Sequence, residues 1–278
     1  MKLIRLLLLL MCGMVLVVPA GAGAQQKKYT LAVVPQAQVS EIFERWLPFL
    51  KRLSRDTGVE IDLVPYNSFQ QFETDLQKGV PDFAYMNPYQ AMNAKTSGGY
   101  IPLIRDKADL VGILVAHKGS GINSVKDLSG KQISFPGPAN FAASVYLRAL
   151  LTEKEHVAFT PVYAKTHGNV YRTVSLDKAA AGGGVLKTFN KEQPELKNQL
   201  TIIYETPGTA SHPIAAHPRV PEALRKSVAK AILALAQDSA NKEMLNNVQL
   251  PDPIEADFQR DYSPLKKLKL EKYFTKEE

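Results

Sequence analysis

Hydrogen-bond donors gather where a short apolar run meets a proline-rich turn. Ile133 to Phe135 is predicted to be a buried strand, which Pro136-Gly137-Pro138 must end, because proline cannot continue a strand ladder. Asn140 is a favourable N-cap residue, and apolar residues at helical spacing follow it as far as Leu151. The free N–H groups of such a first helical turn, 140–142, could bind an anion or a carbonyl oxygen. Strand–turn–helix units are common in α/β proteins, however, and most of them bind nothing.

Other polar residues follow predicted strands. Gln36 comes after the predicted strand Tyr29–Val34, and Asn87 comes after Asp82–Met86. Because ligands of open α/β sheets bind at the carboxyl ends of strands, both residues are candidates for ligand contacts, Gln36 the weaker one. Asn87 has an equally good interpretation as a helix start. His167 begins a predicted helix after a strand, a position that is also typical of a surface or capping histidine.

Alternating strands and helices must position these residues. The predicted first helix, 39–55, carries five apolar residues on one face, namely Ile42, Trp46, Phe49, Leu50 and Leu53. Gly58 is expected to end this helix, and Ser68 with Gln71 has the capping-box spacing of a second helix start. This alternation predicts an α/β fold with mostly parallel sheets that helices cover on both faces.

The strand–helix pattern restarts near residue 117 and becomes helical after residue 220. We therefore predict two lobes, the first from 25–115 and 207–278 and the second from 116–206. The hinge is expected near Val115-Ala116 and Thr206-Pro207, and the ligand between the lobes. Gly182-Gly183-Gly184 lacks the Lys-Ser/Thr of a phosphate-binding loop, and we interpret it as a flexible or tightly packed junction.

The first 24 residues have the pattern of a signal peptide. Met1 to Arg5 is basic, Leu6 to Val18 is apolar, and a small-x-small pattern ends at Ala24. Export to the periplasm and cleavage after Ala24 are predicted. Cys12 is the only cysteine and lies in the apolar run, so the mature chain would contain neither a disulfide nor a cysteine nucleophile.

Charge and motifs narrow the function. Removing Lys2 and Arg5 from the 34 basic residues leaves a formal charge of +5 against 27 acidic residues. This excess favours an anionic small molecule or a nearby anionic membrane surface, and it forms no dense stripe typical of a nucleic-acid binder. The sequence has no Gly-x-Ser-x-Gly elbow, no His-Glu-x-x-His and no close cluster of metal ligands. We therefore expect a binding protein rather than an enzyme, acting as a monomer without a metal.

Several segments resemble one family. These are the leader, the first strand and helix, Pro81-Asp82-Phe83-Ala84, the run from Gly121 to Lys131, and the run from Ser211 to Pro218. They resemble the periplasmic phosphate/phosphite/phosphonate-binding proteins of ABC importers, over nearly the whole mature chain. The Gly121–Lys131 run is shared widely among class II periplasmic binding proteins and therefore indicates fold more than ligand.

The resemblance implies a two-lobed clamshell that closes on a small anionic solute and delivers it to the permease of an ABC importer. The alternative is a sensory protein of the same fold that docks on a membrane sensor kinase. An enzyme on this fold is a third, less favoured interpretation, because fold alone does not exclude chemistry.

The resemblance also implies a ligand site. The family's Asp-Pro-x-Ser-Thr-Ser-Gly motif, which holds phosphoryl oxygens, corresponds to Gly137–Ala143, so Asn140, Phe141 and Ala142 replace its three hydroxyl residues. Two family tyrosines correspond to Phe69 and Met86, the family histidine to His167, and an acidic residue to Ala180. On closure, one lobe would supply Asn87, Tyr89 and Phe69, and the other His167 and the N–H groups of 140–142.

These replacements bear on the ligand. Each missing hydrogen bond to a charged group costs about 1.5–3 kcal/mol, so weaker phosphonate binding than in the family is expected. Either the ligand needs fewer hydrogen bonds, which the backbone N–H groups, Asn140 and His167 can supply, or the ligand is less charged and partly apolar. A small oxyanion (phosphate-, phosphite- or phosphonate-like) or an organic acid is predicted, one per molecule.

Overall fold

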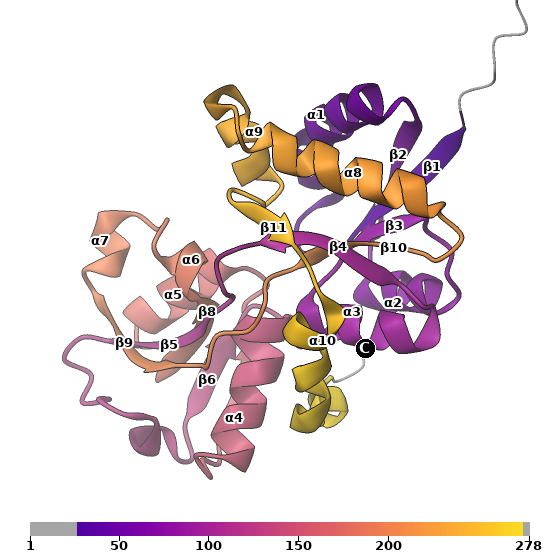
Figure 1. The fold of residues 1–278 in the computed structure, drawn as a ribbon. Coiled ribbons are helices and arrows are strands. Elements are labelled where there is room, and N and C mark those ends of the chain that lie inside the picture. Colours follow the sequence, from indigo (N-terminus) through magenta and orange to yellow (C-terminus); the bar gives the residue numbers. More distant parts are fainter. Residues whose placement is uncertain (1–26, 275–278) are drawn as a thin grey trace, which may run out of the picture.

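The computed structural model describes residues 27–274, and the predicted signal peptide lies outside this range. Strands in the described part form two separate sheets, each with its own helices (Figure 1). No helix within residues 27–274 combines the length and apolar character needed to cross a membrane.

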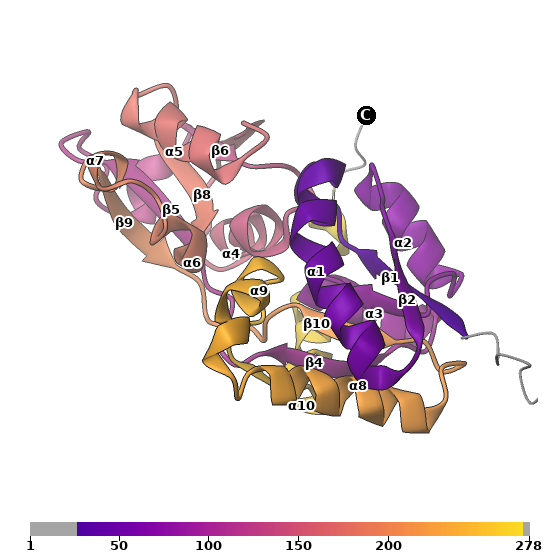
Figure 2. The ribbon, with the colours of Figure 1, turned by 90° about the horizontal axis from the view of Figure 1, so that it is seen from above.

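The first sheet has six strands in the order β11-β4-β10-β3-β1-β2. Its strands are β1 (Lys28–Val33), β2 (Glu60–Val64), β3 (Phe83–Tyr85), β4 (Ile101–Asp106), β10 (Pro213–Ala216) and β11 (Pro253–Glu255). The helices of this part are α1 (Val39–Thr57), α2 (Phe69–Gln77), α3 (Pro88–Ser97), α8 (Glu222–Leu235), α9 (Lys242–Asn247) and α10 (Phe258–Asp261). Helices α1 and α8 cover one face of the sheet, and α2 and α3 lie on the other (Figures 1 and 2).

Helix α1 shows how directly the pattern of this part dictates its packing. All five apolar residues predicted to face the core are buried, and Trp46 and Phe49 pack edge to face with ring centroids 5.8 Å apart. The helix ends at Gly58, whose φ of 72° is a left-handed conformation that glycine adopts without a steric penalty. The position of this helix against the sheet therefore follows from local sequence.

The second sheet has five strands in the order β7-β6-β8-β5-β9. Its strands are β5 (Gly112–His117), β6 (Gln132–Phe135), β7 (Thr160–Tyr163), β8 (Ala181–Val185) and β9 (Leu200–Glu205). The accompanying helices are α4 (Leu147–Glu153), α5 (His167–Ser175), α6 (Leu186–Phe189) and α7 (Pro194–Lys197). Shorter turns of helix are Val125–Leu128, Phe141–Tyr146, Ser239–Asn241, Ser263–Leu268 and Leu270–Tyr273.

The sheets are mixed, which corrects the prediction of mostly parallel sheets. Strand β1 pairs in parallel with β2 and β3, whereas β10 is antiparallel to β3 and β4, and β11 to β4. In the second sheet β6 is parallel to β7 and β8, but β5 is antiparallel to β8 and β9. The antiparallel strands β5 and β10 are those through which the chain enters the second sheet and returns to the first, against the direction of their neighbours.

The chain crosses between the sheets earlier than the predicted hinge at Val115-Ala116. Strand β5 pairs with β8 and β9, so residues 115 and 116 belong to the second sheet, and the first crossing lies between Asp106 and Gly112. The return lies between Glu205 and Pro213, and it contains the second predicted hinge segment. An isolated bridge joins the two crossings, because the N–H of Leu110 donates to the oxygen of Thr209 at 2.7 Å.

The glycine triplet is part of the central strand of the second sheet, not a junction. A Cβ at Gly183 would stand 2.3 Å from the oxygen of Ala143, and one at Gly184 would stand 2.2 Å from the hydroxyl of Tyr171. These glycines therefore let the 141–146 turn and helix α5 approach the strand closely from its two faces. The tight packing was anticipated, but the strand was not, because a run of glycine has low strand propensity.

Candidate functional site

The carboxyl ends of strands from both sheets face each other. The crossings run from the end of β4 to the start of β5 and from the end of β9 to the start of β10. The predicted residues of the first part lie on its facing edge, in segments that follow β1, β2 and β3; they are Gln36, Phe69, Met86, Asn87 and Tyr89. Those of the second part lie after β6 and β7, and they are Asn140, Phe141, Ala142 and His167.

Asn87 combines a structural role with a free donor. Its Oδ1 accepts from the N–H of Gln90 at 2.8 Å, and its own N–H donates to Gln90 Oε1 at 3.0 Å, which completes a capping box on α3. The side chain is buried, yet its Nδ2 has no hydrogen-bond partner within residues 27–274. Because the cap occupies the oxygen, the amide nitrogen is left to bind something else.

Gln36 is exposed and bonds to a histidine of the return crossing. Its amide nitrogen lies 2.7 Å from Nε2 of the buried His212, whose ring stacks on Tyr85 with centroids 5.4 Å apart. An amide nitrogen can only donate, so this ring nitrogen accepts and the imidazole is neutral. Burial, together with the nearby charge of Lys187, lowers the pKa of His212 to about 3.

An ion pair joins the two facing edges. Lys187 Nζ, from α6 of the second part, donates to Asp106 Oδ2 at the end of β4 at 3.0 Å. The carboxylate is almost fully buried, and its other oxygen accepts from the N–H of Asp252 at 3.1 Å. The charge of this lysine is therefore matched by a fixed carboxylate.

The segment after β6 differs from the predicted α-helix. Residues Phe141–Tyr146 form a π-helical turn before α4, and the oxygen of Asn140 accepts from the N–H groups of both Ser144 and Val145. The side chain of Asn140 makes no capping bond with the described residues, which corrects the interpretation of this residue as a side-chain cap. The wider turn follows from the close approach of Ala143 to Gly183, which tertiary packing imposes.

His167 is the first residue of α5 and lies partly buried. Lys165, two residues earlier, has a φ of 72°, uncommon for a residue other than glycine, and Thr166 caps the helix through the N–H of Asn169 at 3.2 Å. Burial lowers the pKa of His167 to about 4, so the ring is neutral at pH 7. Its Nδ1 is buried and finds no hydrogen-bond partner in the described part of the chain.

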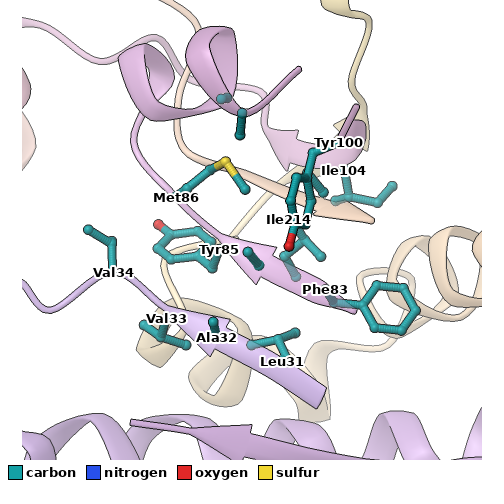
Figure 3. Close-up of a cluster of buried hydrophobic side chains, with 14 of the residues drawn as sticks. Leu31, Ala32, Val33, Val34, Phe83, Tyr85, Met86, Tyr100, Ile104 and Ile214 are labelled. Carbon is teal, nitrogen blue, oxygen red and sulfur yellow. The ribbon is translucent and has the colours of Figure 1, made fainter. Parts of the chain in front are cut away.

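Apolar side chains from both edges share one continuous cluster. Met86 and Tyr89 from the first edge and Phe141 and Ala142 from the second are buried in it, and Phe69 packs against it half-buried. Figure 3 shows part of this cluster, where Met86 lies just beyond the end of the strand that carries Phe83 and Tyr85. These five predicted residues thus belong to one apolar cluster that extends across both parts.

A C-terminal segment also spans the two edges. The buried guanidinium of Arg148 donates to the oxygen of Tyr273 at 2.5 Å, and Lys272 bonds to Glu153 of α4 at 2.5 Å. Phe274 stacks on Tyr89 with centroids 4.6 Å apart. Figure 1 shows this last stretch of the chain between α4 and α3. It therefore ties α4 to a residue of the candidate site.

Two further features were missed at the level of sequence. A cavity of about 340 Å³ lies beside the crossings, where Arg105 and Asp261 form an ion pair of 3.1 Å at its wall. Lys187 could have been noticed only if the glycine run had been recognised as a strand, since it follows that strand at the same edge.

Within residues 27–274, no group of three or more His, Cys, Asp or Glu residues is placed to hold a metal ion.

Solved structures with a similar fold show the fold class of the protein. PhnD1 from Prochlorococcus marinus, in complex with methylphosphonate, has a TM-score of 0.76 at 17% identity and covers 90% of this chain and 99% of its own. XAC2383 from Xanthomonas citri, bound to ATP, has a TM-score of 0.75 at 15% identity, covering 88% and 98%. At these identities the likeness shows the fold, that of two-lobed periplasmic binding proteins, and confirms the predicted fold class.

The sequence comparison identifies the family. The family described as "ABC transporter, phosphonate, periplasmic substrate-binding protein" matches residues 31–262, and the chain belongs to it. A relative, the phosphate-import protein PhnD of Mycolicibacterium smegmatis, is 25% identical over 171 residues, 55% of this chain. The match covers 53% of that relative, so the chain spans about half of its length. The resemblance stated from the sequence is therefore confirmed.

Proposed function

We propose that this protein captures one small oxyanion or organic acid between its two parts, as a monomer, and delivers it to an ABC permease without chemical change. One observation carries the proposal: each facing edge holds a buried polar nitrogen, Asn87 Nδ2 and His167 Nδ1, with no partner among the described residues. Leaving a buried polar group unsatisfied costs about 1–3 kcal/mol. Oxygens of a ligand bound between the edges would satisfy these two nitrogens.

The known ligands of similar proteins support this class of solute. The relative from M. smegmatis is named for phosphate import, and the P. marinus structure contains methylphosphonate. The first-turn N–H groups of 141–142 add donors from the helix start, where backbone groups have no partner within the helix. Gln36 is the outermost of the proposed contacts, because its amide is exposed and already bonded to His212.

The proposed mechanism is closure of the two parts about the crossings 107–111 and 206–212. A ligand stabilises a closed form only through contacts that it makes better there than in the open form. Asn87, Tyr89 and Phe69 would contact it from one side, and His167, Asn140 and the 141–142 turn from the other. Contacts from both edges to one ligand would supply this difference.

A thermal-shift screen tests the proposed function. Phosphate, phosphite, methylphosphonate, methanesulfonate and acetate are each added to the protein without its first 24 residues. A ligand present at about 100 times its Kd raises the free energy of unfolding by about 2.7 kcal/mol. We expect at least one oxyanion of this panel to raise the melting temperature, with a smaller radius of gyration in small-angle scattering. No shift with any of the five compounds would contradict the proposal.

A further inference from the structure

We propose that the cleft selects a singly charged oxyanion with an apolar substituent over a doubly charged oxyanion of the same size. This inference rests on the proposed function and deepens it by naming the charge and shape of the solute. Three features of the facing edges carry it: a lysine whose charge is already matched, neutral nitrogen donors, and an apolar cluster that both edges build.

Of the cations on the facing edges, Lys187 is already paired with a carboxylate, and the buried guanidinium of Arg148 is bonded to the oxygens of Ser144, Pro138 and Tyr273. Lys187 Nζ lies 3.0 Å from Asp106 Oδ2, and this carboxylate is held in place by the N–H of Asp252. A doubly charged ligand near Lys187 would therefore also meet the charge of Asp106. Burying a charge without a compensating partner is costly, and the cost grows with the charge of the ligand.

The remaining donors are neutral. His212 accepts from Gln36 and so carries no charge, and His167 is kept neutral by burial. The charged residues around His167 are Lys165, Arg172 and Glu192. Arg172 and Glu192 both lie within 4 Å of a Cβ placed at Gly168, and their opposite charges offset each other. Neutral donors can satisfy the oxygens of a monoanion, whereas the second charge of a dianion would be buried without a charged partner, which is costly.

Apolar side chains from both edges pack together where the two parts meet. Phe141 and Ala142 are buried with Met86 and Tyr89 in one cluster, and Phe141 stacks in parallel on Tyr146 with centroids 5.8 Å apart. A ligand whose oxygens reach Asn87 and His167 would direct its remaining substituent toward this cluster. Each buried methylene of such a substituent lowers Kd roughly fourfold.

Matched pairs of ligands test the inference. Methanesulfonate and methylphosphonate have nearly the same shape, but only the phosphonate gains a second charge near neutral pH, as phosphate esters do at about pH 6. Titration calorimetry of the protein without its first 24 residues is carried out at about pH 5.5 and about pH 8.5. The pKa values of His167 and His212, about 4 and about 3, lie below this interval, so both rings stay neutral throughout.

We expect the Kd of methanesulfonate to be the same at both values of pH, and that of methylphosphonate to be at least tenfold higher at the alkaline one. Propanesulfonate should bind more tightly than methanesulfonate. Asp106→Asn, which frees the charge of Lys187 and keeps an acceptor for Asp252, should reduce the penalty on the dianion.

The opposite results separate the two proposals. Tighter binding of methylphosphonate at the alkaline pH, or no gain from the propyl group, would overturn the inference on charge and shape while leaving an oxyanion-binding function intact. Absence of binding by every sulfonate and phosphonate at both values of pH would overturn the inference, and absence of binding by phosphate, phosphite and acetate as well would overturn both proposals. If Asp106→Asn does not fold, the comparison of ligands on the unaltered protein still decides the question.

Discussion

The two edges of the candidate site are built by different means. On the first edge, Asn87 is fixed by a capping box with Gln90, three residues away, so its orientation is encoded locally. On the second edge, the turn after Asn140 is shaped by contact with Gly183, and Lys165, two residues before His167, has a left-handed backbone. The first edge can therefore be expected to tolerate changes elsewhere in the chain, whereas the second depends on its neighbours in the fold.

Two neutral histidines, His167 on the second edge and His212 on the return crossing, should make the fold less stable in acid. The unfolded pKa of histidine is about 6.5, and the folded values are lowered to about 4 for His167 and about 3 for His212. Between the folded and the unfolded pKa of each histidine, the unfolded state therefore binds more protons than the folded state. Stability is lost as the pH falls from 6.5 toward the folded pKa. We expect the free energy of unfolding to decrease by up to about 1.4 kcal/mol per pH unit for each histidine.

Urea unfolding at several values of pH measures this slope. His212→Gln and His167→Gln should each reduce it, and a double variant should nearly abolish the contribution below pH 6.5. His117→Gln is the matched control, because His117 lies at the far end of β5 and pairs there with Asp177. An equal slope in all variants would show that burial of these two rings does not govern acid stability.

The dependence of the second edge on packing can be broken at Gly183. Gly183→Ala places a Cβ 2.3 Å from the oxygen of Ala143 and 2.5 Å from the ring of Phe135, so the 141–146 turn must move away from the sheet. Such overpacking costs about 1–3 kcal/mol, and ligand affinity should fall with it. Gly58→Ala, in open space but with φ of 72°, serves as a control that strains only the first part. Unchanged affinity in Gly183→Ala would show that the turn does not position a ligand contact.

His167 provides a direct test of the donor on the second edge. If it donates to a charged oxygen, His167→Ala should weaken binding by about 1.5–3 kcal/mol, while the melting temperature without ligand changes little, because Nδ1 makes no bond with the described residues that the variant could lose. Calorimetry with the best compound of the thermal-shift screen measures the loss. His117→Ala should bind as the unaltered protein does, and equal behaviour of the two variants would remove His167 from the site.

Two variants of Asn87 separate its cap from its donor. Asn87→Ser keeps an N-cap oxygen for Gln90 but removes the amide nitrogen, and Asn87→Ala removes both. Both should weaken ligand binding, but only the alanine variant should also lose about 1 kcal/mol of stability. Thermal unfolding with and without ligand distinguishes these outcomes. Full affinity in Asn87→Ser would leave Asn87 a purely structural residue.

Local sequence determined the features that involve residues close together in the chain. The buried face of α1, its end at Gly58 and the positions of the strands before Gln36 and Asn87 all follow from periodicity and capping over three or four residues. The alternation of strands and helices was likewise sufficient for an α/β fold with two parts.

Tertiary structure decided the rest, because it depends on pairs of residues far apart in the chain. Strand β5 belongs to the second sheet only because β8 and β9 pair with it, and the glycine run becomes a strand only because helices press on it from two sides. Lys187 and Asp106 are 81 residues apart, and no local pattern connects them. The charge balance of the cleft, and with it the class of ligand we propose, is therefore a property of the folded chain.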